Sequence, residues 1–309
     1  MQYVSSISFG VILVLVLAIY GFVFHGSSSD ENDTNGTDVQ ATKSIIKNKG
    51  SDTMVNLAQA WAEVYSNDTV SVEVSGGGSG TGVAALINGT VDIANCSRQV
   101  KDKEKQQAID NTGREPIEFI VGYDALAVYV HKDNPIDKIT IPQLAEIYGE
   151  EGTITKWDNL GVANSGCRSD KIIRISRQSN SGTYFYFREA LLGKERDFEL
   201  GSLDLHGSKD VVEVVGRTHC AIGYSGMGYA TDHVKKLKVA TAEDAPYYAP
   251  NLENVLTKSY PIARPLYMYS LGEPTGEAKA YLDWILSPEG QKIVQELGFV
   301  PLQGNTTSN

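Results

Sequence analysis

Three times along this chain, a short apolar stretch of the kind that forms a β-strand leads into glycine, serine and threonine residues that begin a helix. These junctions lie at residues 50–53, 78–82 and 181–183. Strand-like and helix-like segments alternate from Ile45 onward, and this alternation predicts an α/β fold. The repeated junction also indicates where a binding site would form.

The chemistry of the three junctions suits an anion. The first turn of a helix has free backbone N–H groups and a partial positive charge. Glycine lets the backbone approach a ligand closely, and serine or threonine adds a hydroxyl donor. Arg177, four residues before Ser181, can add two parallel N–H donors. Each junction alone is also compatible with an ordinary helix cap or a flexible loop, but together they predict a site for a tetrahedral oxyanion.

Composition and motifs argue against several other functions. The chain has 27 Lys and Arg against 38 Asp and Glu, and its net charge of −11 disfavours nonspecific nucleic-acid binding. The glycine-rich segment lacks the lysine of a nucleotide-binding P-loop, and Thr81 stands where a hydrolase G-x-S-x-G motif needs its last glycine. None of the five histidines has metal-site spacing, so we expect no metal, no cofactor and no enzyme. An enzyme would need histidines that the fold brings to these motifs, such as His131 or His219.

The N-terminal segment predicts a membrane anchor. Residues 7–24 are free of charge, and as a helix they would span about 27 Å, close to the thickness of a bilayer core. The alternative is a cleaved signal peptide, but the first six residues carry no Lys or Arg and no A-x-A cleavage site follows. We therefore expect an anchor over residues 1–26, a polar disordered tether over 27–42 and a flexible tail over 303–309.

Glycosylation sequons and cysteines give weaker information on location. The N-x-S/T sequons begin at Asn32, Asn35, Asn67, Asn88, Asn95 and Asn305. They favour a position outside the cell. The odd number of cysteines allows at most one internal disulfide and one free thiol. The sequence leaves open which of Cys96, Cys167 and Cys220 pair, and all three could equally be buried apolar thiols.

Two long apolar segments predict two lobes. Residues 119–130 and 260–269 both read as extended chain, and each could cross from one lobe to the other. Lobe 1 would then consist of residues 43–124 together with 262–302, and lobe 2 of residues 125–261.

Several motifs together resemble a known family. These are GSDTM at 50–54, GGGSGTG at 76–82, VDIANCSRQ at 91–99, RQSNSGTYFYFRE at 177–189 and YPIARPLY at 260–267. The chain from residue 45 to 302 resembles the phosphate-binding proteins of ABC importers. The resemblance implies a two-lobed, hinged fold of the type II periplasmic-binding-protein class, with phosphate held in the cleft. It also implies a monomer that works outside the cell membrane and delivers phosphate to a permease and its ATPase.

The resemblance also implies a set of phosphate ligands. Carried over position by position, they are Ser51, Asp52, Thr53, Ser79, Ser97, Arg98, Arg177, Ser181, Gly182 and Thr183. Ser51, Asp52, Thr53 and Ser79 belong to lobe 1. Arg177, Ser181 and Thr183 would act from lobe 2 through their side chains, and Gly182 mainly through its N–H group.

One position departs from the family pattern. Many members have an aspartate that accepts the proton of bound phosphate where this chain has Ser97. We hypothesise that Asp52 takes over this role, because a carboxylate accepts a hydrogen bond from protonated phosphate and repels sulfate. Alternatively, Asp52 is only a helix cap, and Arg98 is either a further anion contact or the partner of Asp52. Sulfate, molybdate or tungstate remain alternative ligands, a phosphatase-type enzyme is a weaker alternative, and the sequence does not separate transport from sensing.

Overall fold

The computed structural model describes residues 43–302, which belong to one compact unit, Ala41–Asn309. The expected anchor, tether and C-terminal tail lie outside the described residues. Within residues 43–302, no helix has both the length and the apolar character that a membrane span requires.

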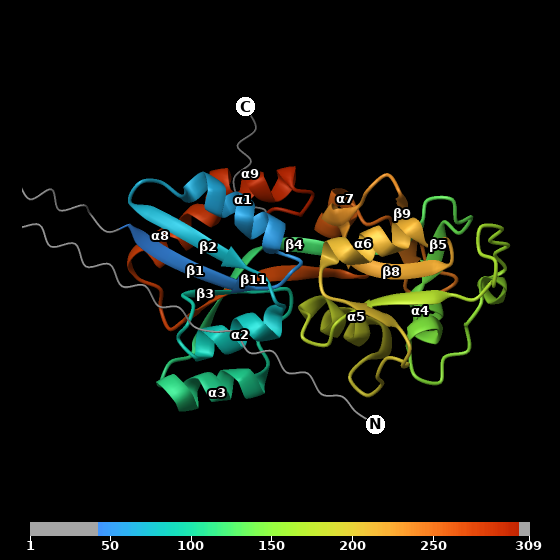
Figure 1. Cartoon of the computed structure of the whole chain (residues 1–309), viewed down its shortest axis with the longest axis horizontal. Helices are drawn as coiled ribbons and strands as arrows, with labels where there is room; N and C mark the ends of the chain where they lie inside the picture. The colour runs from blue at the N-terminus through green and yellow to red at the C-terminus, as the bar shows by residue number, and fades with distance from the viewer. Residues whose placement is uncertain (1–42, 303–309) are drawn as a thin grey trace, which may run out of the picture. The chain divides into compact units, whose positions relative to one another are not determined.

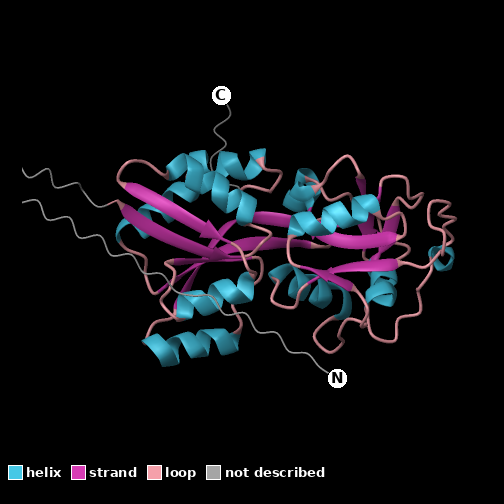
Figure 2. Cartoon of the chain, in the orientation of Figure 1, coloured by secondary structure: helices cyan, strands magenta, loops and turns pink. Residues whose placement is uncertain are grey.

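A nine-stranded sheet runs through the described chain (Figures 1 and 2). Its strand order is β2 (Val70–Ser75), β1 (Ser44–Gly50), β3 (Ile93–Cys96), β11 (Ala263–Leu271), β4 (Pro116–His131), β8 (Ala221–Gly226), β6 (Ile173–Arg177) and β7 (Leu203–Leu205). The ninth strand, β9 (Val234–Lys236), also pairs with β4, and a separate small sheet joins β5 (Lys138–Thr140) to β10 (Lys238–Ala240).

Two parallel groups of strands flank a central antiparallel pair. β1 pairs in parallel with β2 and β3, and β6 pairs in parallel with β7 and β8. Between these groups, β4 and β11 run antiparallel, with a register shift between Leu266 and Tyr267. Because the carboxyl ends of parallel strands lie at one edge of a sheet, the loops after β1 and β3 come together there.

Helices cover both faces of the sheet, as the α/β pattern predicted. They are α1 (Val55–Tyr65), α2 (Ser79–Ile87), α3 (Asp102–Thr112), α4 (Ile141–Tyr148), α5 (Gly182–Leu192), α6 (Ser208–Arg217), α7 (Leu252–Leu256), α8 (Gly276–Ile285) and α9 (Pro288–Glu296). Figure 1 shows α1, α8 and α9 on one side of β1, β2 and β3, with α2 and α3 on the other. Around β6 and β8, α6 and α7 lie opposite α4 and α5.

Buried apolar side chains form separate cores. One core takes its buried members from residues 125–262 together with Val300. Two further clusters draw on residues 46–121 and 266–299. We call the parts built around these cores lobe 2 and lobe 1, and the mixed α/β, two-lobed fold predicted from the sequence is thereby confirmed. Strand β4 belongs to both lobes, since Val121 packs in one core and Ala125 in the other.

One disulfide forms among the three cysteines. Cys167 pairs with Cys220 and ties the loop before β6 to the residue before β8. Cys96 is free and buried, and burial raises the pKa of its thiol to about 12. The limit of one disulfide and one free thiol is confirmed, whereas the alternative of three unpaired buried cysteines is wrong.

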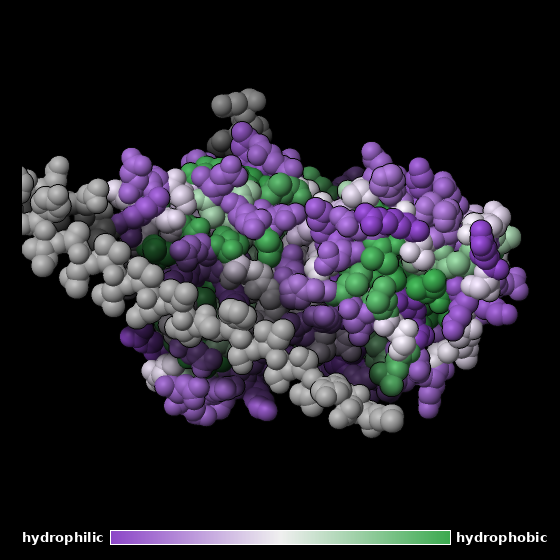
Figure 3. All heavy atoms as spheres, in the orientation of Figure 1, coloured by the Kyte–Doolittle hydropathy of each residue, from purple (hydrophilic) through white to green (hydrophobic). Residues whose placement is uncertain are grey.

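One face of the described molecule is mainly polar. Figure 3 shows a largely hydrophilic face, with hydrophobic side chains gathered chiefly over the lobe that contains β8 and α5. A polar surface with a net charge of −11 agrees with a chain whose apolar residues are used mainly in its cores.

Candidate functional site

The three strand-to-helix junctions meet between the lobes. Thr53, in the turn that precedes α1, lies with its Oγ1 atom 2.6 Å from Oγ1 of Thr183 in the first turn of α5. In lobe 1, Ser51 Oγ donates to Ser97 Oγ at 2.8 Å, and Ser79 Oγ lies 3.4 Å from the same Ser97 oxygen. All of these side chains are buried. The structure therefore gathers hydroxyl groups from loops that are far apart in the sequence.

The lobes touch closely at the first turns of α2 and α5. A Cβ atom on Gly182 would clash with Oγ of Ser79 and would lie 2.6 Å from Oγ of Ser97. Close by, the side-chain amide of Asn180 donates to the carbonyl of Gly77 at 3.0 Å, and the backbone carbonyl of Asn180 accepts the N–H of Gly80 at 3.3 Å. Only a glycine fits at position 182 when the two lobes are this close.

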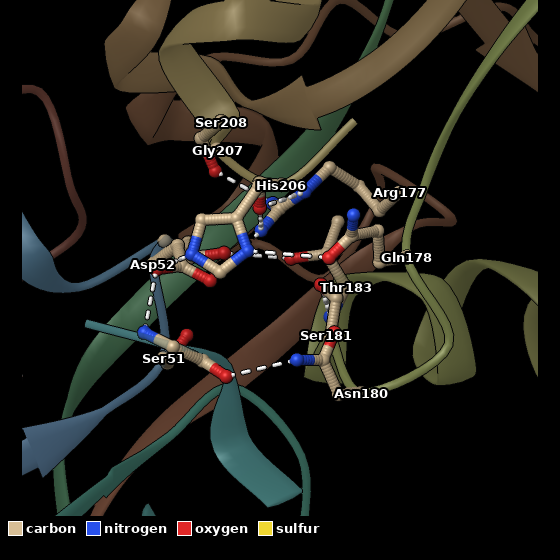
Figure 4. A network of polar contacts seen from close by, with 12 residues as sticks. Ser51, Asp52, Arg177, Gln178, Asn180, Ser181, Thr183, His206, Gly207 and Ser208 are labelled. Carbon is tan, nitrogen blue, oxygen red and sulfur yellow. Dashed lines mark hydrogen bonds and ion pairs between the residues drawn. The ribbon is translucent and has the colours of Figure 1, made fainter. Parts of the chain in front are cut away.

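Arg177 is held from several directions at the end of β6 (Figure 4). Its Nε and Nη2 atoms donate to the carbonyl of His206 at 3.1 and 2.6 Å, and Nη1 donates to Ser208 Oγ at 2.9 Å. Nη2 also lies 3.3 Å from Oδ2 of Asp52 in lobe 1. Burial lowers the pKa of Arg177, and the Asp52 carboxylate opposes this shift. The guanidinium is thus a fixed, buried cation that faces both lobes.

Asp52 is not the cap of a helix. Helix α1 begins at Val55, its N-cap position is Met54, and no side chain caps it. Instead, Asp52 Oδ1 accepts the N–H of Gly77 at 2.9 Å and Oδ2 pairs with Arg177. The interpretation of Asp52 as a simple cap is therefore wrong. Ser181, by contrast, does cap α5, because its Oγ accepts the N–H of Thr183 at 3.1 Å.

Arg98 pairs with a carboxylate of its own lobe rather than with a residue of the hydroxyl cluster. Its two Nη atoms donate to the Glu104 carboxylate at 2.8 and 2.7 Å, and its guanidinium lies 5.6 Å from the centroid of the Phe185 ring. The alternative that Arg98 pairs with Asp52 is wrong, since Asp52 pairs with Arg177. Glu104, six residues further along the chain, binds the Arg98 guanidinium, and the motifs of the family did not indicate this ion pair.

Two residues of this site were absent from the predicted set. Arg264 on β11 donates to Thr183 Oγ1 at 2.9 Å, to Thr53 Oγ1 at 3.3 Å and to the carbonyl of Ser97 at 2.8 Å. It also pairs with Asp124 on β4 at 3.1 Å, and both side chains are wholly buried. Burial raises the pKa of Asp124, and the Arg264 charge opposes this shift. The sequence feature that could have indicated Arg264 is an arginine inside the otherwise apolar motif YPIARPLY.

A pocket of about 600 Å³ opens beside the hydroxyl cluster. It reaches Ser97 and Arg264, which belong to the cluster, and it lies between α5 and the segment that follows β3. Its lining carries more cations than acids: the cations are Arg98, Lys101, Arg188, Lys194 and Arg264, and the acids are Asp102 and Glu189. Four of these cations pair with carboxylates: Arg98 with Glu104, Arg188 with Asp197, Lys194 with Glu189 and Arg264 with Asp124. The pocket therefore carries much less free positive charge than its residue types alone indicate.

Comparisons with known proteins agree with this geometry. The profile of the PBP superfamily domain matches residues 30–289. The phosphate-binding protein PstS of Pseudomonas aeruginosa is 36% identical over 269 residues, which cover 83% of each chain. A putative phosphate ABC transporter substrate-binding protein from Clostridium perfringens, solved with bound phosphate, superposes with a TM-score of 0.73. It is 31% identical and covers 84% of this chain and 100% of its own.

A more distant structure has the same fold. It is an ABC-type phosphate transport receptor from Vibrio cholerae, with a TM-score of 0.65 and 27% identity over 83% of this chain and 100% of its own. The two-lobed fold with a polar site between its lobes defines a solute-binding protein. The chain belongs to the PBP superfamily and, within it, to the family of PstS-like phosphate-binding proteins.

Proposed function

We propose that this protein binds inorganic phosphate between its lobes and delivers it to the permease and ATPase of an ABC importer, without catalysing a reaction. The observation that carries the proposal is the convergence of buried hydroxyl groups from both lobes beside one fixed arginine. A tetrahedral dianion needs many donors and a buried countercharge, and this arrangement supplies both.

Closure of two lobes around the ion would bring the ligands together. We assign residues 43–124 and 262–302 to lobe 1 and residues 125–261 to lobe 2. The separate cores support these bounds, except that Ile262 and Val300 pack in the core of lobe 2. The proposed phosphate ligands are Ser51, Asp52, Thr53, Ser79, Ser97, Arg177, Ser181, Gly182 and Thr183. The hydroxyl groups that now pair with one another would donate to phosphate oxygens instead. Arg98, which pairs with Glu104, is proposed to line the pocket beside the site rather than to contact the ion.

The ligand identity and the role of Asp52 can be tested together by calorimetry with phosphate, arsenate, sulfate and molybdate. The protein should bind phosphate tightly and leave sulfate unbound, because sulfate has no proton to donate to the Asp52 carboxylate. In Asp52→Asn, we expect the preference for phosphate over sulfate to fall roughly 10- to 100-fold, as a hydrogen bond to a charged acceptor is lost.

A matched control for this experiment is Asp92→Asn. Asp92 also accepts a backbone N–H, from Lys47 at 2.8 Å, but it is not among the proposed ligands, so the phosphate preference should stay unchanged. Tight sulfate binding by the unmodified protein would contradict the proposed ligand. Phosphate binding with an unaltered preference in Asp52→Asn would contradict only the role of Asp52.

The close approach of the lobes at Gly182 leads to a second prediction. In Gly182→Ala, the new methyl group meets the Oγ atoms of Ser79 and Ser97, so the lobes cannot close fully. Overpacking of this kind costs about 1–3 kcal/mol, which is roughly 5- to 150-fold in phosphate affinity. Thermal unfolding without phosphate should change little, since the lobes can separate and relieve the clash.

The control for Gly182→Ala is Gly80→Ala. Gly80 occupies the first turn of α2, as Gly182 does in α5, but a Cβ atom there meets its nearest neighbour, the Asn180 carbonyl oxygen, at 3.6 Å. This is an ordinary contact, and affinity should be kept. Equal losses in the two variants would mean that helix-start glycines matter for a reason other than lobe closure.

We further propose that the protein is a monomer that acts outside the cell, held to the membrane by residues 1–26 through the tether 27–42. The uncharged stretch 7–24 and the sequons of the sequence support this location. An uncleaved anchor keeps the protein in the membrane fraction during carbonate extraction, and its release into the wash would contradict the anchor.

A further inference from the structure

Two histidines and an aspartate meet on lobe 2, away from the residues proposed to bind phosphate. His131 is the last residue of β4, Asp133 follows two residues later, and His219 lies just before β8. The two imidazole rings stack with their centroids 3.8 Å apart and their planes at 25°. One possible ligand atom from each of the three residues lies within 4.8 Å of the others.

Packing, a disulfide and a hydrogen bond fix the chain at the two histidines. His131 is buried, and the disulfide at Cys220 fixes the chain next to His219. The His219 carbonyl accepts a hydrogen bond from Asn164 at 2.8 Å, and its ring packs so closely on Gly166 that a Cβ atom there would clash. The Asp133 side chain is 64% exposed. The chain at both histidines is therefore fixed, and an exposed carboxylate lies beside them.

Two imidazoles and one carboxylate form a donor set that Zn²⁺ and related transition-metal ions bind. Ligand atoms about 2.0–2.2 Å from a tetrahedral ion lie roughly 3.3–3.6 Å from one another, so ligand atoms that now lie within 4.8 Å must draw together by up to about 1.5 Å. Oδ2 of Asp133 already lies 3.7 Å from Nδ1 of His131, so the ring of His219 must turn out of its stack on His131 to bring its lone pair toward the same ion. The Nδ1 lone pair now accepts the N–H of Asp133 at 3.1 Å, and a metal bond would replace this contact.

The electrostatics of the group are mixed. Burial lowers the pKa of His131, and the nearby His219, Lys132 and His233 lower it further, although Asp133 opposes them. A depressed pKa keeps the imidazole neutral, which is the form that binds metal. The positive charge of Lys132 weakens the binding of a cation, so we expect an affinity below that of a structural zinc site.

We propose that His131, His219 and Asp133 bind a divalent transition-metal ion, with Zn²⁺ the best-fitting example and water completing its coordination. The ion would join the end of β4 to the start of β8 within lobe 2. The sequence spacing did not indicate this group, because 88 positions separate the two histidines. The proposal does not depend on phosphate binding.

Titration of the full-length protein with ZnCl₂ in phosphate-free buffer, after removal of metal with EDTA, tests this site. We expect one saturable Zn²⁺ site, a higher midpoint of thermal unfolding when it is filled, and no comparable effect of Mg²⁺ or Ca²⁺, which prefer oxygen ligands. His219→Ala should weaken Zn²⁺ binding roughly 30-fold or more, and Asp133→Asn should weaken it roughly 10-fold.

His233→Ala is the matched control, since His233 lies near the group but is not one of its three ligand residues. It should keep the Zn²⁺ site, and phosphate affinity should remain normal in His219→Ala. Because His219→Ala and Asp133→Asn leave the buried His131 in place, neither result depends on the folding of a core variant. Absence of a saturable site, or equal binding by wild type and His219→Ala, would overturn the proposal.

Discussion

Arg177→Ala is expected to weaken phosphate binding by about 3–5 kcal/mol, roughly 150- to 5000-fold in Kd, because a buried dianion loses its charged partner. The guanidinium of Arg177 is fixed by the His206 carbonyl and by Ser208, so no other group can take its place without rearrangement. Arg177→Lys should recover only part of the loss, since a single ammonium group cannot reproduce the planar fork of an arginine. Calorimetric titration of the purified variants measures the effect.

Arg174→Ala provides the matched control on the same strand. Its guanidinium donates to the carbonyls of Ile147 and Leu200 and takes no part in the site between the lobes. Phosphate affinity in this variant should stay within about threefold of wild type, whatever happens to stability. Wild-type affinity in Arg177→Ala would mean that the phosphate site lies elsewhere in the protein.

The second large effect concerns stability. Asp124→Ala should lower the free energy of unfolding by about 3–5 kcal/mol, because Arg264 would remain as a buried charge without its carboxylate. Urea denaturation of the phosphate-free protein measures this loss. Phosphate affinity should also fall, since Arg264 orients the hydroxyl groups of Thr53 and Thr183.

An exposed ion pair supplies the comparison for Asp124. Asp137 pairs with Lys235 at 2.7 Å, but its side chain is 77% exposed, and such pairs contribute about 1 kcal/mol or less. Asp137→Ala should therefore change the unfolding free energy only slightly. Similar losses in Asp137→Ala and Asp124→Ala would show that the buried pair has no special role in holding the strands between the lobes.

Local sequence patterns predicted where two of the site's helices begin and which hydroxyl residues the site uses. The junctions at 78–82 and 181–183 do begin helices, and the hydroxyl residues of the three junctions gather between the lobes, because strand ends and helix starts follow from a few neighbouring residues. The alternative role of Asp52 as a helix cap is wrong, because α1 begins three residues later, at Val55.

Long-range pairing decided what the patterns did not predict. Asp124 pairs with Arg264 across 140 positions, and Cys167 pairs with Cys220 across 53. Neither of these contacts has a periodic signal in the sequence, because each depends on how two strands or loops meet after the lobes have formed. For the same reason, the sequence did not predict that His131 and His219 lie together.

The discontinuity of lobe 1 has a consequence for biosynthesis. The core of lobe 2 takes nearly all of its members from one continuous stretch, whereas lobe 1 needs Leu266, Tyr281 and Val294 from the last part of the chain. Strands β1, β2 and β3 are translated first, and α1 and α2 can pack on them early, but their core is not complete until β11, α8 and α9 have been synthesised. The middle of the polypeptide should thus mature before its beginning, and the early segments would depend on protection from aggregation until the chain is complete.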